Sequence, residues 1–245
     1  RGSDLSLSEN HQIVATPPDG CEVIGFDGSP ADGTAYEVTW DAEAAEKGGY
    51  DTFMEKEIYE QPHAVADTPL GRTDDEGRLV LDAVRISAEQ LGQTDRIVIV
   101  ACGPAAYAVE RWTRIPVEVA LAHEFRYSDP IADARTLVVS ISQSGETMDT
   151  LMAVKHAREL GALTLSICNT HGSTIPRESD AVLYTHAGPE VAVASTKGFS
   201  AQITAAYVLG LYLAQMRGGE HAVNAQAVMR ELRGLPDHIQ TVLDR

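Results

Sequence analysis

Short apolar runs alternate with longer segments of helical spacing over most of the chain after residue 94. The runs are rich in Val, Ile and Leu, which is typical of strands that are buried on both faces. Strands that alternate with helical crossovers form parallel sheets covered by helices on both sides. We therefore predict an α/β fold, a three-layer α/β/α domain with a five-stranded parallel sheet. Its strands are expected at residues 96–101, 117–121, 137–142, 162–167 and 181–185.

The first 40 residues show a weaker pattern of short strands. Candidates at residues 12–15, 21–26 and 36–40 are separated by turns that contain Pro and Gly. Two or three short strands cannot form an independent hydrophobic core. We therefore interpret residues 1–40 as the edge of a β-rich domain.

Helical patterns lie on both sides of the predicted α/β domain, which we place at residues 76–218. Helix-forming residues indicate a linker over residues 41–75. Residues 200–215 are apolar nearly all round, which predicts a helix buried in the core or in a subunit interface and permits a homodimer. Residues 219–245 have the pattern of a final amphipathic helical segment, interrupted near Pro236.

The composition limits the classes of function. The 245 residues carry a formal net charge of -17, with a sequence pI of about 4.7 and no evident cluster of Lys and Arg. Nucleic acid binding requires such a cluster, so we exclude nucleic acid as a partner. No apolar run is long enough to span a bilayer, so we expect no membrane partner. Three cysteines without CxxC spacing favour a reducing, cytoplasmic location and no structural zinc.

The segment at residues 142–147 carries the strongest chemical signal. Its sequence, Ser-Gln-Ser-Gly-Glu-Thr, joins an apolar run to a stretch of helical spacing. The first N–H groups of a helix have no partner within the helix, and the helix dipole is positive there. A hydroxyl-rich turn before a helix is therefore a ready anion site, and phosphate is its natural ligand.

An ordinary helix cap is the alternative interpretation of the same residues. Ser144 or Thr147 would cap the helix, and Glu146 would lie in its first turn. This accounts for one hydroxyl but not for Ser142, Ser144 and Thr147 together around a glycine. We therefore favour the phosphate site.

Other polar residues have structural interpretations that we favour over catalytic ones. Lys197 as a catalytic amine would need a pKa lowered by burial, whereas an ion pair or a helix N-terminal position explains it simply. His123 is interpreted as structural, and His156 and His171 as surface or capping residues. The acidic run at residues 74–76 is interpreted as a solvated surface rather than a metal site.

Several segments taken together resemble a known family. Residues 142–147 combine with Ala-Cys-Gly at 101–103, His-Glu-Phe-Arg-Tyr at 123–127, Ile-Cys-Asn at 167–169 and Val-Ala-Ser-Thr-Lys at 193–197. In this order the segments resemble the sugar isomerase (SIS) domain family. The resemblance extends in particular to the family of glutamine–fructose-6-phosphate aminotransferases (isomerizing), also called glucosamine-6-phosphate synthases.

The resemblance implies an activity and a ligand. Enzymes of this family make glucosamine 6-phosphate from fructose 6-phosphate with ammonia taken from glutamine. They use no metal or organic cofactor and work as homodimers or larger assemblies. The residues that the resemblance assigns to fructose 6-phosphate or glucosamine 6-phosphate are Ser142, Gln143, Ser144 and Thr147 for the phosphate, with Val193 and Ser195 on the sugar side.

The resemblance also has limits along the chain. Residues 45–50 and 56–62 are similar to the linker between the glutaminase and isomerase domains, so residues 1–40 would be a glutaminase-domain remnant. The nucleophilic cysteine of that glutaminase has no counterpart here. The catalytic Lys, Glu and His of the family belong mostly to a second SIS domain, which we expect this chain to lack, so we assign no catalytic residue. Pro104 stands where the family usually has a sugar-holding threonine, and the segment 103–112 is shorter than in the family.

Two alternatives from other classes stay open. One is a non-catalytic SIS module that binds a sugar phosphate. The other is a stand-alone SIS isomerase, which needs a catalytic base or lysine in this chain or in a dimer partner. Turnover of fructose 6-phosphate with ammonia separates an enzyme from a binding module.

Overall fold

The computed structural model divides the chain into two compact units. The first unit is Arg1–Ala42 and the second is Glu43–Arg245. The structure describes residues 4–7, 12–16, 20–37, 46–81, 84–100, 105–192, 194–218 and 224–245.

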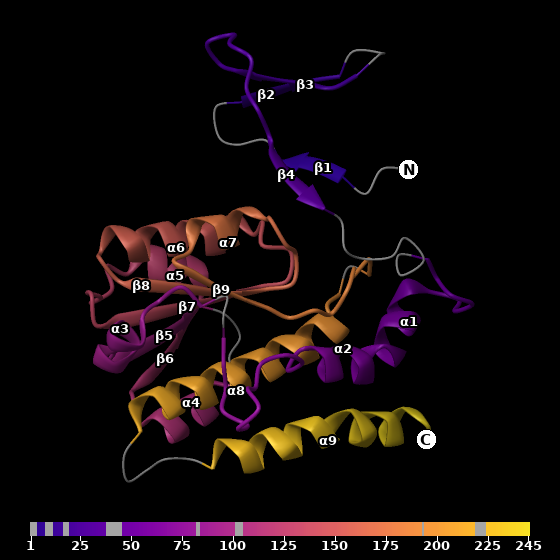
Figure 1. Cartoon of the computed structure of the whole chain (residues 1–245), viewed down its shortest axis with the longest axis vertical. Helices are drawn as coiled ribbons and strands as arrows, with labels where there is room; N and C mark the ends of the chain where they lie inside the picture. The colour runs from indigo at the N-terminus through magenta and orange to yellow at the C-terminus, as the bar shows by residue number, and fades with distance from the viewer. Residues whose placement is uncertain are drawn as a thin grey trace. The chain divides into compact units, whose positions relative to one another are not determined.

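The described residues of the first unit form two antiparallel pairs of short strands (Figure 1). The pairs are β1 (Asp4–Leu7) with β4 (Thr34–Glu37) and β2 (Gln12–Ala15) with β3 (Glu22–Gly25). Strands β2 and β3 match two predicted strands, β4 starts before the predicted range 36–40, and β1 was not predicted. Ile13 and Val14 of β2 are exposed, and isolated two-stranded pairs are only marginally stable in water.

The second unit is built around a five-stranded sheet with strand order β6-β5-β7-β8-β9. The strands are β5 (Arg96–Val100), β6 (Val117–Ala120), β7 (Thr136–Ser142), β8 (Leu163–Cys168) and β9 (Ala181–Tyr184). Every neighbouring pair is parallel, so all the carboxyl ends lie at one edge. The predicted α/β class and its five predicted strands are confirmed.

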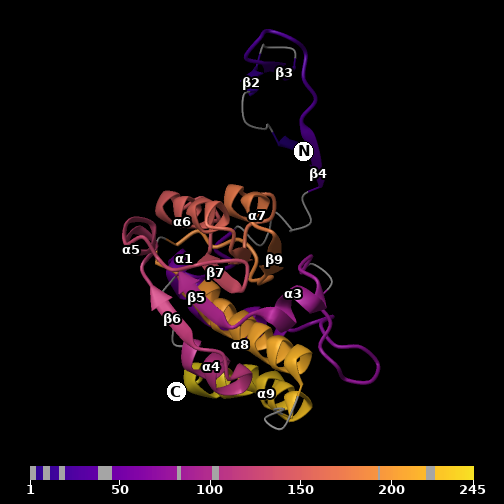
Figure 2. The ribbon, with the colours of Figure 1, turned by 90° about the vertical axis from the view of Figure 1, so that its left-hand side faces the viewer.

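Helices cover both faces of this sheet (Figures 1 and 2). The helical layers are α3 (Ala88–Gln93), α4 (Ala106–Thr113) and α8 (Lys197–Arg217) on one face, and α5 (Ala122–Tyr127), α6 (Met148–Glu159) and α7 (Thr174–Glu178) on the other. Strand β5 shows why the sheet accepts two layers. Ile97 and Ile99 belong to the apolar core on the α8 side, whereas Val98 and Val100 pack with α5 and α6.

Helix α8 is the central helix of its layer. It extends the predicted range 200–215 in both directions and contacts α2, α3, α4 and α9 as well as the sheet. The side chains of Leu209, Leu211 and Leu213 are all buried in the core of this chain. The prediction of a helix buried in the core or in an interface is therefore confirmed for the core. None of the described helices is both long and apolar enough to cross a membrane.

Two short helices precede the sheet, and the second of them packs against α8. They are α1 (Phe53–Tyr59), which starts after the N-cap Thr52, and α2 (Gln61–Asp67), which has a proline in its first turn. Ala64 of α2 packs with Ala187 and with Ala201 of α8. Both helices lie in the segment expected as a linker, and both belong to the second compact unit.

Helix α9 (Ala225–Leu243) is continuous through Pro236, so the predicted interruption there is wrong. Met229 and Leu232 bury the N-terminal half of this helix in the main core, and α9 also packs along α2. Tertiary packing therefore maintains the helix although a proline removes one of its backbone hydrogen bonds.

Truncating a buried side chain of α8 tests this packing. Leu211 is 0% exposed, whereas Leu70 in the turn after α2 is 65% exposed. We expect Leu211→Ala to lower the free energy of unfolding by about 2–5 kcal/mol, because it removes buried apolar atoms and leaves a cavity. Leu70→Ala should cost no more than about 0.5 kcal/mol. Urea unfolding of both variants measures the difference, and equal losses would contradict the assigned core.

Candidate functional site

An open cavity of about 370 Å³ lies at the carboxyl end of β7. Ligands in open α/β sheets bind at this edge of the sheet. Five of the six predicted site residues line the cavity, namely Ser142, Gln143, Ser144, Thr147 and Ser195. The sixth, Val193, lies outside the described residues, as do Cys102, Gly103 and Pro104. Ile141, Thr150, Glu190, Ala192 and Gln202 complete the lining.

Residues 142–147, here called the hydroxyl turn, form the first wall of the cavity. Ser142 Oγ accepts a hydrogen bond from Gly145 N at 3.1 Å, and Ser144 Oγ accepts one from Glu146 N at 3.2 Å. Ser142 Oγ also lies 3.4 Å from Thr147 Oγ1. A serine hydroxyl that accepts from a backbone N–H still has its own hydrogen to donate. The turn therefore presents hydroxyl donors to the cavity in a shape fixed by its own backbone.

Helix α6 begins directly after this turn, and its N-terminus has no side-chain cap. Thr147 is the N-cap residue, but its side chain makes no capping hydrogen bond. The alternative interpretation, in which Ser144 or Thr147 caps the helix, is therefore wrong. The first N–H groups of α6 stay available, and the positive end of the helix dipole lies at the cavity.

The helix-cap interpretation placed Glu146 in the first turn of α6, but Glu146 precedes the N-cap residue Thr147. Its Oε1 accepts a hydrogen bond from Thr174 N at 2.8 Å, at the start of α7. Gly145 O accepts from Ile175 N at 2.9 Å, and Gln143 O accepts from Asn169 N at 3.2 Å. The hydroxyl turn is thus fastened to the segment between β8 and α7.

Gly145 is the one residue of the turn that cannot carry a side chain. Its φ is +69°, and a Cβ atom there would lie 2.0 Å from Ser173 Oγ and 2.9 Å from Cys168 Sγ. The Cys168 thiol itself is buried, and this burial raises its pKa. Cys168 is therefore a neutral packing residue beneath the turn.

Residues 190–192 and 194–196, here called the acidic wall, form the opposite side of the cavity. Glu190 Oε1 accepts hydrogen bonds from Thr196 N at 2.8 Å and from Gly198 N at 3.0 Å. Ser195 Oγ donates to Glu190 Oε2 at 3.1 Å. The carboxylate of Glu190 therefore occupies the N-terminus of α8, and Ser195 offers the cavity an acceptor oxygen.

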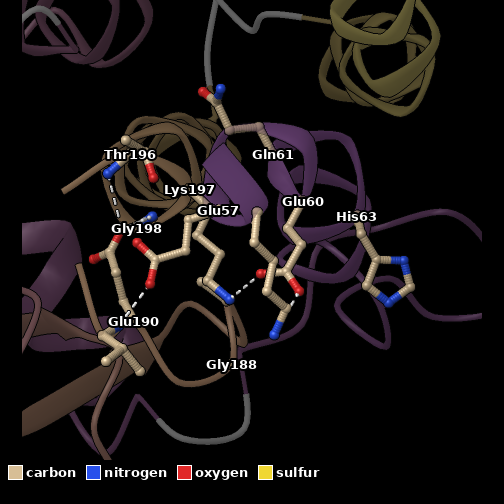
Figure 3. Close-up of polar contacts among 12 residues, drawn as sticks. Glu57, Glu60, Gln61, His63, Gly188, Glu190, Thr196, Lys197 and Gly198 are labelled. Carbon is tan, nitrogen blue, oxygen red and sulfur yellow. Dashed lines mark hydrogen bonds and ion pairs between the residues drawn. The ribbon is translucent and has the colours of Figure 1, made fainter. Parts of the chain in front are cut away.

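Helix α1 supports the acidic wall from behind (Figure 3). Glu57 is 2% exposed, and its Oε1 accepts from Val191 N at 2.6 Å and from Ala192 N at 2.9 Å. Lys197, at the start of α8, is 4% exposed and pairs with Glu60 Oε2 at 2.7 Å. Lys197 is thus an ion-pair partner in a helix N-terminal position, as predicted, and not a free amine.

Sequence reasoning missed Glu57 and Glu190. Glu190 had only a weak local signal, because it precedes the N-cap Thr196 and does not lie in the first turn of α8, where carboxylates are favoured. Glu57 had none, because its hydrogen-bond partners lie 134 and 135 residues further along the chain.

The remaining candidates lie away from the cavity. His123 is exposed on α5, and His156 pairs with Glu159 across one turn of α6. His171 stacks on Tyr184 with ring centroids 3.8 Å apart, and burial lowers its pKa. In the acidic run, Asp74 pairs with Arg78. No group of three His, Cys, Asp or Glu that could hold a metal occurs among the described residues.

Comparisons with known proteins identify the family of this chain. A sequence profile of the SIS domain matches residues 90–212. The chain is 60% identical over 243 residues to the glutamine–fructose-6-phosphate aminotransferase (isomerizing) of Corynebacterium diphtheriae, covering 96% of this chain and 39% of that protein. It is 61% identical over 239 residues to the protein of the same name from Streptomyces coelicolor, covering 95% of this chain and 39% of that protein.

A solved structure shows the same fold. The C-terminal domain of glucosamine-fructose-6-phosphate aminotransferase from Francisella tularensis matches with a TM-score of 0.72 and 36% sequence identity. The match covers 78% of this chain and 56% of that one. The chain spans about two fifths of the length of the two relatives above.

Alanine variants of two glycines with positive φ can distinguish backbone strain from crowding. Gly145 lies in the hydroxyl turn, and Gly161 lies outside it. Gly161 has φ +84° with nothing within 4 Å of a built Cβ, whereas Gly145 would clash with Ser173. We expect Gly161→Ala to lower the free energy of unfolding by about 1–2 kcal/mol, the cost of a left-handed conformation. Gly145→Ala should lose about 1–3 kcal/mol more, because it also overpacks the site. Urea unfolding measures both, and equal losses would contradict the crowding.

Proposed function

This chain belongs to the SIS domain family, and we propose that it is the sugar-phosphate-binding isomerase part of a glutamine–fructose-6-phosphate aminotransferase (isomerizing). Its ligand would be fructose 6-phosphate or glucosamine 6-phosphate. One observation carries the proposal: an uncapped helix N-terminus and the hydroxyls of Ser142, Ser144 and Thr147 line one cavity. The identity of 60% and 61% to proteins of that name supports it.

The phosphate would bind at the hydroxyl turn through neutral donors. None of the described residues that line the cavity is Lys or Arg. The available donors are the first N–H groups of α6, the side-chain amide of Gln143 and the hydroxyls of the turn. Such donors act together with the positive end of the helix dipole and are sufficient to hold a phosphate.

The sugar would extend from the hydroxyl turn toward the acidic wall. Glu190 and Ser195 present acceptor oxygens there, and these match the hydroxyl and amino hydrogens of a hexose or hexosamine. A phosphate avoids this wall, because the Glu190 carboxylate repels a second negative charge. In this proposal the chain binds and orients the substrate. Holding the substrate in one orientation lowers the activation barrier for its reaction with groups supplied elsewhere.

The proposal extends to a homodimer in the cytoplasm, as the family resemblance implies. The apolar side chains of α8 do not add support for a dimer, because Leu209 and Leu211 are buried in the core of this chain. The dimer therefore rests on the resemblance. Free thiols at Cys21 and Cys168 support a reducing compartment.

Removing the three hydroxyls tests the phosphate site. A hydrogen bond to a charged group contributes about 1.5–3 kcal/mol. We therefore expect Ser142→Ala/Ser144→Ala/Thr147→Ala to weaken binding of glucosamine 6-phosphate at least about 100-fold. Isothermal titration calorimetry of the unmodified chain and this variant measures the change.

The control for this experiment removes hydroxyls from other helices. Ser128 follows α5 and Thr241 lies near the end of α9, and both are exposed. Ser128→Ala/Thr241→Ala should bind glucosamine 6-phosphate like the unmodified chain. Binding that survives in the triple variant, or is absent from the unmodified chain, would refute the proposed function.

A further inference from the structure

Two carboxylates hold the backbone of the acidic wall in place. Glu57 accepts hydrogen bonds from the N–H groups of Val191 and Ala192, and Glu190 accepts those of Thr196 and Gly198. Glu190 belongs to the wall itself. Glu57 comes from α1, which lies in the segment before the sheet (Figure 3).

Burying the Glu57 carboxylate costs free energy that its hydrogen bonds must offset. The side chain is 2% exposed, and among the described residues its Oε2 has no hydrogen-bond partner. Burying a carboxylate with one unsatisfied oxygen is unfavourable. The other oxygen, Oε1, makes two charge-assisted bonds to backbone N–H groups, and such bonds are stronger than neutral ones.

Helices α1 and α2 are themselves fixed to the body of the fold. Glu60 pairs with Lys197, and Ser200 Oγ donates to Gln61 Oε1 at 2.7 Å. Thr68, just after α2, donates to Thr185 O at 3.0 Å. Glu57 therefore presents its carboxylate from a rigid support, so the position of α1 is passed on to Val191 and Ala192.

The two walls of the cavity have different main supports, and Asn169 links the segments behind them. Its N–H donates to Gln143 O at 3.2 Å, and its Nδ2 donates to Gly188 O at 2.7 Å. The hydroxyl turn is bonded to Asn169, Thr174 and Ile175 on the β8–α7 side of the sheet. The acidic wall is bonded to Glu57 of α1 and to the start of α8. Glu57 bonds to Val191 and Ala192 of the acidic wall and not to the hydroxyl turn, so a change at Glu57 should move the acidic wall more than the hydroxyl turn.

We propose that Glu57 is a positioning residue that sets the preference of the cavity for a sugar phosphate over inorganic phosphate. It does so through Val191 and Ala192, without touching the ligand. The inference rests on the proposed function, since it assigns the phosphate group to the hydroxyl turn and the sugar to the acidic wall. Inorganic phosphate needs only the first wall, whereas glucosamine 6-phosphate needs both.

Calorimetric titration with these two ligands tests the inference. We expect Glu57→Ala to weaken binding of glucosamine 6-phosphate by about tenfold or more, because two wall N–H groups lose their acceptor. Binding of inorganic phosphate should change by less than about twofold, a difference smaller than one hydrogen bond contributes. Glu57→Gln keeps an acceptor oxygen for both N–H groups, so it should recover part of the sugar-phosphate affinity and keeps the test valid if Glu57→Ala folds poorly.

A matched control lies on the same helix. Glu55 is exposed and sits two residues from Glu57, on the opposite face of α1. Glu55→Gln should leave the affinity for both ligands unchanged.

Each other result has a definite meaning. An unmodified chain that binds neither ligand overturns the proposed function and this inference with it. An unmodified chain that binds both ligands, with a ratio of affinities that Glu57→Ala does not alter, overturns the role of Glu57 alone. A parallel loss of both affinities would also overturn it, because that result indicates general damage to the fold.

Discussion

The first N–H groups of α6 and of α8 have no acceptor within their own helices, and the cavity lies between these two helix starts. A side chain of the chain itself accepts at one of them and not at the other. At α8, the chain supplies its own anion, because Glu190 accepts from the N–H groups of Thr196 and Gly198. At α6, no side chain caps the helix, although Thr147 stands at the N-cap position. A helix end already occupied by a carboxylate repels a further anion, whereas an uncapped end attracts one. The position of the proposed anion site therefore follows from which of the two helices is left without a carboxylate at its N-terminus.

This arrangement depends on charges that are buried away from water. Glu57 and Lys197 are both nearly inaccessible, and such groups are tolerated only when they are paired or hydrogen-bonded. Glu57 accepts hydrogen bonds from two backbone N–H groups of the acidic wall, and Lys197 forms an ion pair with Glu60 of the segment that precedes the sheet. Helices α1 and α2 thereby contribute to the wall of a cavity whose other side belongs to β7 and α6. Their role is positional, since none of the described residues that line the cavity belongs to α1 or α2.

The sequence allowed good prediction where the relevant signals are local. The five parallel strands are short, mainly apolar runs, and residues 142–147 carry their hydroxyls and glycine within one turn, so the sheet and five residues that line the cavity could be predicted. The predicted break at Pro236 failed because contacts of Met229 and Leu232 with the core outweigh the local effect of a proline. Glu57 was missed because nothing near it in sequence shows that it meets Val191, and Glu146 was misplaced because its partner Thr174 belongs to another helix. Long-range hydrogen bonds of single side chains leave no periodic pattern.

The opposite electrical character of the two walls has a consequence for any ligand with one anionic end. The hydroxyl turn offers donors and the positive end of α6, while the acidic wall offers the oxygens of Glu190 and Ser195. A ligand placed the other way round would bring its anion against Glu190 and leave the donors of Ser142 and Ser144 without an acceptor, and both effects are unfavourable. In the proposed site, one orientation of such a ligand would therefore be preferred before any reacting group is considered. The fold holds the hydroxyl turn mainly through the β8–α7 segment and the acidic wall through α1. Because Asn169 bonds to both Gln143 and Gly188, a change at α1 acts first on the acidic wall and reaches the hydroxyl turn only through this link.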